Sequence, residues 1–361
     1  MNYFESIEKI LGYPQYSLKK KEKESLLLNS FIHLNKHHYK NCDAYRSILE
    51  KVFPKFKNDH LIKLEDIPYI PVQLFKDFEL ISTDRKNIFK TMLSSGTSGK
   101  KQSKIFLDKE TAILQTKVLS NIVASFLGSK RVPMLIIDSQ KVIKERNLFS
   151  VRRAATLGFS IFGKEISFAL DENMNLDLNV LKKFQEISKK QKTLIFGFTN
   201  IVWTNLINSL LLKKENIDLT KSMLIHGGGW KKLQDQKISN KDFKDLLYKT
   251  TNISNIINYY GMVEQTGSVY MECEKGFLHS SNFSDILIRK KDDFSICQFK
   301  EKGIIQVFSV LPFSYPGHSL LTEDLGTIYG EDDCPCGRSG KYFKVFGRIP
   351  KAEIRGCSDA Y

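Results

Sequence analysis

Long apolar runs are missing from the sequence. Aliphatic stretches such as residues 134–137 and 210–212 are far shorter than the roughly 20 residues that a membrane-spanning helix needs. The N-terminus reads Met-Asn-Tyr-Phe-Glu-Ser-Ile-Glu, without the basic segment and apolar stretch of a secretory signal peptide. We therefore expect no membrane span and a cytoplasmic location, where thiols stay reduced.

Cysteine is scarce, with six residues among 361. In a reducing compartment these residues are expected as metal ligands, nucleophiles or core side chains before disulfides. They are Cys42, Cys273, Cys297, Cys334, Cys336 and Cys357.

Acidic residues are outnumbered by basic ones, 40 to 55, which gives a net charge of +15. A basic balance can indicate nucleic acid, an anionic membrane or an anionic substrate. Here the lysines are spread along the chain, and short runs such as residues 19–21 and 189–190 are separated by acidic side chains. With no nucleic-acid-reading motif, we expect a solvated lysine-rich surface and no nucleic-acid partner.

Hydrophobic periodicity predicts an α/β protein. Helical spacing dominates residues 1 to about 60, and prolines interrupt it at residues 67–71. Buried-strand and helical patterns then alternate, which favours a core of mainly parallel strands. From about residue 270 the strands become short and are split by Gly, Pro and acidic turns. The expected strands are 131–138, 192–198, 222–226, 285–289 and 303–310, and the expected core helices are 180–190 and 200–213.

These changes in the hydrophobic pattern along the sequence predict four regions. Residues 1–66 form an N-terminal helical region, and residues 67–269 form the α/β core. Residues 270–346 form a smaller β-rich subdomain, and residues 347–361 form a C-terminal tail.

One segment of small polar residues suits a polyphosphate. Residues 94–100 read Ser-Ser-Gly-Thr-Ser-Gly-Lys, which offers backbone N–H groups, hydroxyls and a lysine. The segment does not match the P-loop pattern, Gly-x-x-x-x-Gly-Lys-[Ser/Thr]. Taken alone, such a run is more often an ordinary solvent loop.

Four later segments add nucleotide-binding chemistry in a fixed order. His-Gly-Gly-Gly-Trp (226–230) follows an expected strand and permits close approach of a planar ligand. Tyr-Tyr-Gly-Met-Val-Glu (259–264) places an aromatic ring beside a glycine and a carboxylate, which suits adenine stacking and Mg²⁺. Thr-Glu-Asp-Leu-Gly (322–326) is expected to present an aspartate in a turn, and Gly-Arg (347–348) supplies a fixed cation.

In this order the segments resemble the adenylate-forming enzyme superfamily. More closely, the chain resembles the acyl-protein synthetase family, which includes the fatty-acid-activating subunit of the bacterial luciferase aldehyde-generating complex. Phenylacetate–CoA ligase is a more distant relative. The resemblance runs from about residue 67 onwards and is carried by residues 67–76, 94–100, 226–232, 260–268, 315–326 and 347–359.

The resemblance implies an adenylate-forming-enzyme-like large N-terminal lobe with mainly parallel sheets and a smaller β-rich subdomain. It implies ATP and Mg²⁺ as cofactors, and it implies catalytic roles for Lys100, Glu264, Arg348 and a cysteine near the C-terminus. The cofactor-binding residues that it implies are Ser95, Thr97, Ser98, Gly99 and Lys100 for the phosphates, Gly228, Gly229, Tyr260 and Gly261 for adenine, Glu264 for Mg²⁺, Asp324 for ribose and Arg348 near phosphate and ribose.

The sequence departs from the superfamily pattern in two places. The superfamily usually has a hydroxyl residue just before the glutamate, where this chain has Val263; Thr266 or the phosphate loop is the expected substitute. The superfamily also carries a mobile C-terminal domain with a catalytic lysine, whereas this chain ends thirteen residues after Arg348. We therefore expect that domain to be largely absent, with Lys351 as a candidate replacement.

Cys357 is the candidate acyl acceptor. It lies four residues from the end of the sequence, and a terminal tail can reach an active site. Arg355 favours the thiolate, whose attack on a mixed anhydride gives a thioester. The resemblance implies the same role, because members of the acyl-protein synthetase family carry the acyl group on a cysteine near the C-terminus. The alternative is a surface cysteine without a role.

Two residue pairs give a candidate zinc site. Cys334-Pro335-Cys336 offers two thiols, and Cys273 with His279 offers a second pair. Together they make a Cys₃His set, the ligand count of a structural zinc site. Cys297 is a competing ligand, and the alternative is that the two pairs never meet.

We therefore predict a ligase that converts a carboxylic acid, expected to be a long-chain fatty acid, to acyl-AMP and transfers it to a protein thiol. The expected partner is an acyl reductase, and an oligomer remains open. One alternative is an acyl- or aryl-CoA ligase of a surface-polysaccharide or antibiotic pathway. The alternative from another class is a non-catalytic nucleotide- or zinc-binding interaction protein.

Overall fold

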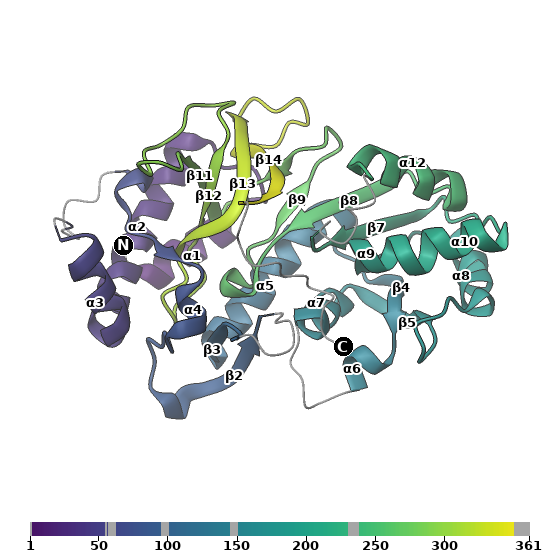
Figure 1. The fold of residues 1–361 in the computed structure, drawn as a ribbon, viewed down its shortest axis with the longest axis horizontal. Coiled ribbons are helices and arrows are strands. Elements are labelled where there is room, and N and C mark those ends of the chain that lie inside the picture. Colours follow the sequence, from purple (N-terminus) through teal and green to yellow (C-terminus); the bar gives the residue numbers. More distant parts are fainter. Residues whose placement is uncertain are drawn as a thin grey trace. The chain divides into compact units, whose positions relative to one another are not determined.

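The computed structural model describes residues 2–54, 56, 63–94, 101–144, 151–229 and 238–349 (Figure 1). Internal contacts divide these residues into two compact units, which are described separately. Unit 1 contains the described residues of 1–94, 101–122 and 261–349, and unit 2 contains those of 123–260. The four regions predicted from the sequence divide the chain differently and stay a prediction.

Three helices open unit 1, as the periodicity of the first 60 residues predicted. They are α1 (Tyr3–Leu11), α2 (Lys20–Asn41) and α3 (Asp43–Val52). The first begins with a capping box, in which the side chains of Asn2 and Glu5 each accept a hydrogen bond from the other's backbone N–H. Because its apolar residues recur at helical spacing, α1 buries one face.

An antiparallel sheet forms the centre of unit 1. Its strand order is β11-β12-β13-β14-β10-β9, and the short strand β1 pairs with β13 in parallel. A separate antiparallel pair, β2 and β3, completes the strands of this unit. The bounds are β1 (Ile70–Pro71), β2 (Ile88–Leu93), β3 (Lys104–Asp108), β9 (Tyr270–Glu272), β10 (Leu278–His279), β11 (Ser284–Arg289), β12 (Gly303–Ser309), β13 (Ser319–Glu331) and β14 (Lys341–Arg348).

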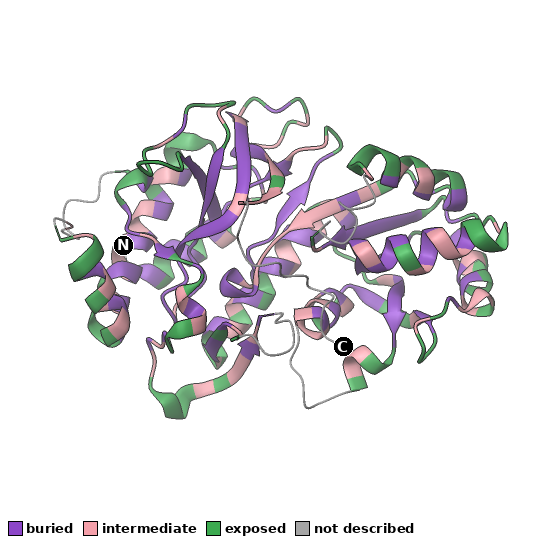
Figure 2. Cartoon of the chain, viewed as in Figure 1, coloured by how far each residue is buried: buried purple, intermediate pink, exposed green. Residues whose placement is uncertain are grey.

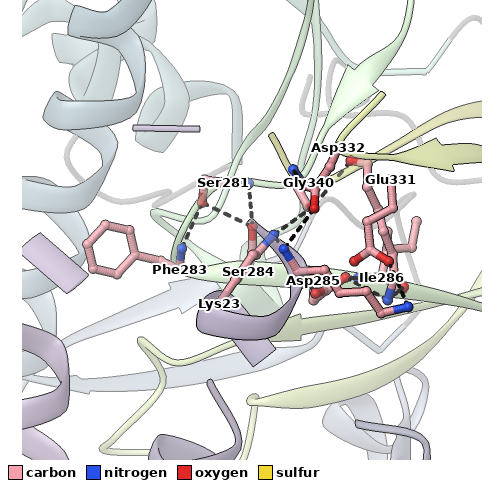
Figure 3. A network of polar contacts seen from close by, with 12 residues as sticks. Lys23, Ser281, Phe283, Ser284, Asp285, Ile286, Glu331, Asp332 and Gly340 are labelled. Carbon is pink, nitrogen blue, oxygen red and sulfur yellow. Dashed lines mark hydrogen bonds and ion pairs between the residues drawn. The ribbon is translucent and has the colours of Figure 1, made fainter. Parts of the chain in front are cut away.

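A buried ion cluster joins α2 to this sheet (Figure 3). Asp285 Oδ2 lies 3.8 Å from Lys23 Nζ, and its Oδ1 lies 3.0 Å from Lys341 Nζ. Burial opposes ionisation of the Asp285 carboxyl, but Lys341 and Lys23 outweigh it and hold its pKa below the ordinary value. The two lysines therefore neutralise a carboxylate inside the unit.

Unit 2 contains a five-stranded parallel sheet, as the β–α alternation predicted. Its order is β8-β7-β6-β4-β5, and every neighbouring pair is parallel. Parallel strands covered on both faces are apolar throughout, and all six residues of β6 and of β7 are buried. The bounds are β4 (Val132–Ser139), β5 (Gly163–Leu170), β6 (Thr193–Phe198), β7 (Ser222–Gly227) and β8 (Asn255–Tyr260).

Helices cover both faces of the parallel sheet. On one face, Phe159 of α7 (Val151–Ser160) stacks on Phe196 with ring centroids 4.4 Å apart. The adjacent residue, Gly197, points to the other face, where a Cβ would meet Val202 Cγ2 at 2.7 Å. The helical segment at residues 199–213 corresponds to the helix predicted at 200–213. It therefore packs on that second face and includes a π-helical segment.

The remaining helices are amphipathic or short. Figure 2 shows exposed and buried residues alternating along α8, α10 and α12, whereas the strands are mostly buried. No helix among the described residues is long and apolar enough to cross a membrane. The bounds are α4 (Leu74–Asp77), α5 (Lys109–Leu127), α6 (Lys141–Lys144), α7 (Val151–Ser160), α8 (Leu178–Lys190), α9 (Thr199–Ile201), η4 (Val202–Ile207), α10 (Asn208–Lys213) and α12 (Asn240–Thr251), with short 3₁₀ turns η2 (Leu64–Asp66), η3 (Arg85–Asn87) and η5 (Val263–Gln265).

Candidate functional site

The adenine-binding candidates of unit 2 lie at the ends of two neighbouring strands. β7 ends at Gly227 and β8 ends at Tyr260, and the pair Gly227–Tyr259 is the last in register. Gly228 and Gly229 follow β7 directly, and Gly228 has a left-handed backbone with φ 87°. The carboxyl edge of a parallel sheet is where open α/β folds bind ligands. The structure therefore brings Gly228 and Tyr260 to the carboxyl edge of the same parallel sheet.

The two adjacent tyrosines have different surroundings. The Tyr259 ring lies over Gly227, so close that a Cβ there would be 2.3 Å from Tyr259 Cε1. The same ring packs against Phe159, with centroids 5.1 Å apart. Tyr259 is therefore a packing residue. Tyr260, the next residue of the strand, has its side chain on the opposite face and is half-buried.

Glu264 belongs to a fixed turn in unit 1. It lies in η5 and its side chain is buried, with 3% of the residue exposed. Its neighbour Gln265 anchors the turn, because Nε2 donates hydrogen bonds to the carbonyl oxygens of Gly317 at 2.8 Å and Val307 at 3.2 Å. The Gln265 side chain thus ties the turn that carries the Glu264 carboxylate to the backbone at Val307 and Gly317.

Position 263, just before Glu264, is where the sequence departs from the hydroxyl residue expected from the superfamily pattern, and its side chain is buried and apolar. Val263 is 7% exposed. The Thr266 hydroxyl, which the sequence offered as a substitute, donates to the Val263 carbonyl at 2.9 Å. Its proton is therefore used within the turn, and only its oxygen lone pairs are left for a ligand.

Asp324 and Arg348 are brought together on adjacent strands. They are register partners of β13 and β14, with Arg348 Nε 3.6 Å from Asp324 Oδ1. Arg348 Nη1 also lies 3.4 Å from Glu323 Oε2, and Glu323 accepts a hydrogen bond from Gln73 Nε2. Sequence reasoning missed Glu323 and Gln73, because only the strand pairing and a contact across 250 residues reveal them.

The turn expected at residues 322–326 is wrong. β13 runs without interruption from Ser319 to Glu331, and Asp324 lies inside it. The register with β14 shifts between Leu325 and Gly326. The polar and glycine residues of this segment thus mark a strand irregularity next to Asp324, and cross-strand pairing overrides their turn preference.

The phosphate-loop residues Ser95, Thr97, Ser98, Gly99 and Lys100 lie outside the described residues, as do Lys351 and Cys357. The chain on either side of the loop is described. Ser94 N–H donates to the Ser103 carbonyl at 3.0 Å, and Ser103 N–H donates to Ser94 Oγ at 2.8 Å. These bonds extend the β2–β3 pairing up to the loop.

The two candidate zinc pairs meet in unit 1. One ligand atom each from Cys273, His279, Cys334 and Cys336 lies within 4.8 Å of the others. Cys336 Sγ is 3.4 Å from His279 Nε2. Burial lowers the pKa of His279 to about 4, so its imidazole is neutral and able to bind a metal. Cys297, the competing ligand, is not part of this cluster.

Comparisons with solved structures define the class of the fold. The open conformation of 2-hydroxyisobutyryl-CoA ligase, in complex with 2-HIB-AMP and CoA, matches with a TM-score of 0.70 at 14% identity, covering 94% of this chain and 78% of that one. The same ligase in the thioesterification state matches with a TM-score of 0.69 at 14% identity, covering 94% and 71%. The chain has the fold of the adenylate-forming ligases.

The family follows from the sequence comparison. The model described as "Acyl-protein synthetase, LuxE" matches residues 5–361. The chain belongs to this family, and it is a ligase with acyl-protein synthetase activity and adenylate-forming chemistry. The resemblance expected from the motifs is thereby confirmed.

Two curated proteins are similar to this chain, and both are named long-chain-fatty-acid–luciferin-component ligase. The protein from Vibrio harveyi is 22% identical over 337 residues, covering 89% of this chain and 83% of that protein. The protein from Photorhabdus luminescens is 33% identical over 88 residues, covering 24% of this chain and 68% of that protein.

Proposed function

We propose that this chain activates a long-chain fatty acid with ATP and Mg²⁺ and transfers the acyl group to the thiol of Cys357. The family match across residues 5–361 carries the proposal. The names of both curated relatives support the acyl class. The arrangement of Gly228 with Tyr260, and of Asp324 with Arg348, supports ATP as the nucleotide that the chain binds.

The proposal assigns parts of the nucleotide to residues that the structure describes. Tyr260 would stack on adenine, and Gly228 and Gly229 leave room for the ring beside the strand end. The Asp324 carboxylate would accept hydrogen bonds from the ribose hydroxyls, and the buried Glu264 carboxylate would bind Mg²⁺. Ser95, Thr97, Ser98, Gly99 and Lys100 would hold the phosphates, as the family resemblance implies.

Two displacements make up the reaction. The fatty acid carboxylate attacks the α-phosphorus of ATP, forming acyl-AMP and releasing pyrophosphate. When bound, Mg²⁺ neutralises phosphate charge. Lys100 and Arg348 would stabilise the charge that develops on the phosphate oxygens. The Cys357 thiolate then attacks the acyl carbonyl, AMP leaves, and a thioester forms.

An acyl reductase is the partner that would consume this thioester. For cofactors we propose ATP, Mg²⁺ and one structural Zn²⁺ held by the Cys₃His cluster. We also propose a cytoplasmic location, where thiols stay reduced and free to bind zinc or an acyl group.

Fatty-acid-dependent exchange of pyrophosphate into ATP tests the activation step. We expect exchange with long-chain acids and, for Glu264→Gln, a loss of roughly 100-fold or more, because the carboxylate proposed to hold Mg²⁺ becomes neutral. A circular dichroism spectrum equal to that of the unmodified protein controls for folding. No exchange across acids of 2 to about 18 carbons would contradict the proposal.

Labelled fatty acid tests the acceptor. With ATP, the unmodified protein should retain label after denaturation, and hydroxylamine should release it as expected for a thioester. Cys357→Ser should keep exchange and lose the label, whereas Cys297→Ser should keep both. If Cys357→Ser is labelled normally, or if CoA is the required acceptor, the chain is instead a CoA ligase or uses another thiol.

A further inference from the structure

We infer that the Cys₃His cluster forms a closed zinc site that fastens the N-terminal segment 14–23 to the β-sheet of unit 1. This inference rests on the zinc part of the proposed function. It goes further by identifying the two parts of unit 1 that the ion would hold together, and it does not depend on adenylation.

The geometry matches a tetrahedral site. With Zn–S near 2.3 Å and Zn–N near 2.0–2.1 Å, tetrahedral ligand atoms lie about 3.5–3.8 Å apart. The four atoms of the cluster all lie within 4.8 Å of one another, and Cys336 Sγ and His279 Nε2 are already 3.4 Å apart. Small side-chain movements would therefore complete the coordination of one zinc ion.

Two turns far apart in the sequence supply the thiols in the same way. Each reads Cys-x-x-Gly, at residues 273–276 and 334–337, and in each the glycine N–H donates to the cysteine carbonyl at 2.9 Å. Both glycines have a left-handed backbone, with φ 76° and 81°. In the second turn the Arg338 N–H also donates to Cys336 Sγ at 3.5 Å, which favours the thiolate.

The cluster is closed to a substrate. His279 is fully buried, Cys273 and Cys334 are 4% and 5% exposed, and Cys336 is half-buried. Four protein ligands fill a tetrahedral zinc, so no position is left for water or substrate. The ion would therefore be structural.

The loop that carries two of the ligands also binds the N-terminal segment. Ser339 N–H donates to the Tyr16 carbonyl at 2.8 Å, and Asp332 Oδ2 accepts from Lys20 N–H at 2.8 Å. The Tyr16 ring packs edge-on against His279, with centroids 6.1 Å apart. The segment between α1 and α2 thus rests on the metal-binding loop and on one of its ligands.

The same loop reaches the buried ion cluster. The Asp332 carboxylate that accepts from Lys20 also accepts from Gly340 N–H at 2.7 Å, and Lys341 follows directly (Figure 3). Lys341 Nζ pairs with one carboxylate oxygen of Asp285, and Lys23 Nζ, one turn along α2 from Lys20, lies near the other. Zinc loss would therefore loosen the loop 332–340, the segment 14–23 and the start of α2 together.

Metal analysis tests the site directly. The full-length protein, purified without chelators, should contain one zinc per chain by plasma mass spectrometry. Cys273→Ser and Cys334→Ser should each reduce the zinc content at least about tenfold, the order of effect of removing a metal ligand or its support. Cys297→Ser is the matched control, since this buried cysteine of the same unit lies outside the cluster and should leave zinc unchanged.

Cobalt exchange covers the case in which a variant does not fold. Unmodified protein stripped of zinc and reloaded with Co²⁺ should show thiolate-to-cobalt charge-transfer bands and the intense visible bands of tetrahedral cobalt. Unmodified protein that contains no zinc and gives no such spectrum would overturn the site.

Hydrogen exchange tests the fastening. Removal of zinc from the unmodified protein should speed amide exchange in residues 14–23 and 332–340 by about tenfold or more, with no change in β6 and β7 of unit 2. Equal exchange with and without metal would overturn the fastening role. A zinc-loaded protein without pyrophosphate exchange would retain this inference and contradict the ligase proposal alone.

Discussion

Arg348 and Asp324 are direct partners on β14 and β13, and their side chains form an ion pair with Nε 3.6 Å from Oδ1. The guanidinium is shared with Glu323, which lies 3.4 Å from Nη1. Arg348 thus orients the Asp324 carboxylate while keeping part of its own charge paired elsewhere. A carboxylate oriented in this way is prepared to accept hydrogen bonds from a diol.

Asp324→Asn is predicted to raise the KM for ATP in pyrophosphate exchange by roughly tenfold or more, because a hydrogen bond to a charged acceptor contributes about 1.5–3 kcal/mol. Saturation curves for ATP at fixed fatty acid measure the change. Asp292→Asn, an exposed carboxylate of the same unit, is the control and should leave the KM unchanged. An unaltered KM in Asp324→Asn would exclude the ribose contact.

Gly227→Ala is predicted to destabilise unit 2 by about 1–3 kcal/mol, the usual cost of overpacking. The added Cβ would meet the Tyr259 ring at 2.3 Å. Urea unfolding of Gly227→Ala, Tyr259→Leu and the double variant forms a cycle. Because the smaller side chain relieves the clash, the double variant should be more stable than the sum of the single effects predicts. Strict additivity would contradict the close contact.

Asp285→Asn is predicted to lower the free energy of unfolding by about 3–5 kcal/mol, because Lys23 and Lys341 would stay buried without their counter-ion. Thermal and urea unfolding measure the loss. Glu186→Gln is the comparison, since it breaks an exposed ion pair with Lys189 and should leave the unfolding midpoint in place. A stable Asp285→Asn protein would mean that one lysine is neutral in the native state.

Acid sensitivity is predicted from three buried histidines. Burial lowers the pKa of His226 and His318 to about 3, and it lowers the pKa of His38 well below 6.5. Between these values and an unfolded pKa near 6.5, the unfolded chain binds protons that the native protein does not. This stability is therefore fully present above about pH 6.5 and is lost as the pH falls towards 3.

Urea midpoints at pH 7.5 and 5.5 test the histidine prediction. The midpoint should fall at the lower pH, with each histidine contributing up to about 1.4 kcal/mol per pH unit. In His318→Gln the new side-chain amide can still donate to Asn35 Oδ1, which lies 3.1 Å from His318 Nε2 in the unmodified protein. Because glutamine does not titrate, the urea midpoint of this variant should fall less between pH 7.5 and 5.5. Equal midpoints at the two pH values would contradict the prediction, because they would show that the native protein takes up as many protons as the unfolded chain between these pH values.

The sequence predicted those helices and strands that are determined by the pattern of their own residues. The apolar runs that became β4 and β6 and the periodic residues of α8 carry their own signal. The turn assigned to residues 322–326 failed because pairing of β13 with β12 and β14 outweighs the local preference of Thr-Glu-Asp-Leu-Gly.

Partners distant in the sequence could not be read from it. Nothing near Lys23 indicates that Asp285 neutralises it, and nothing near Gln73 indicates Glu323. The zinc ligands are an intermediate case. Their residue types and spacing suggested a metal, but only the pairing of β10 with β9 and β14 brings the two turns together.

The discontinuous path of unit 1 sets an order for folding during synthesis. β1, at Ile70–Pro71, pairs with β13, and Lys23 of α2 needs Asp285 of β11. All described residues of unit 2 leave the ribosome before either of these later strands exists. Unit 2 can therefore close on itself first, as domains do during translation. The N-terminal helices are synthesised first, but α2 can complete its buried ion cluster only after β11 and β14 have been made.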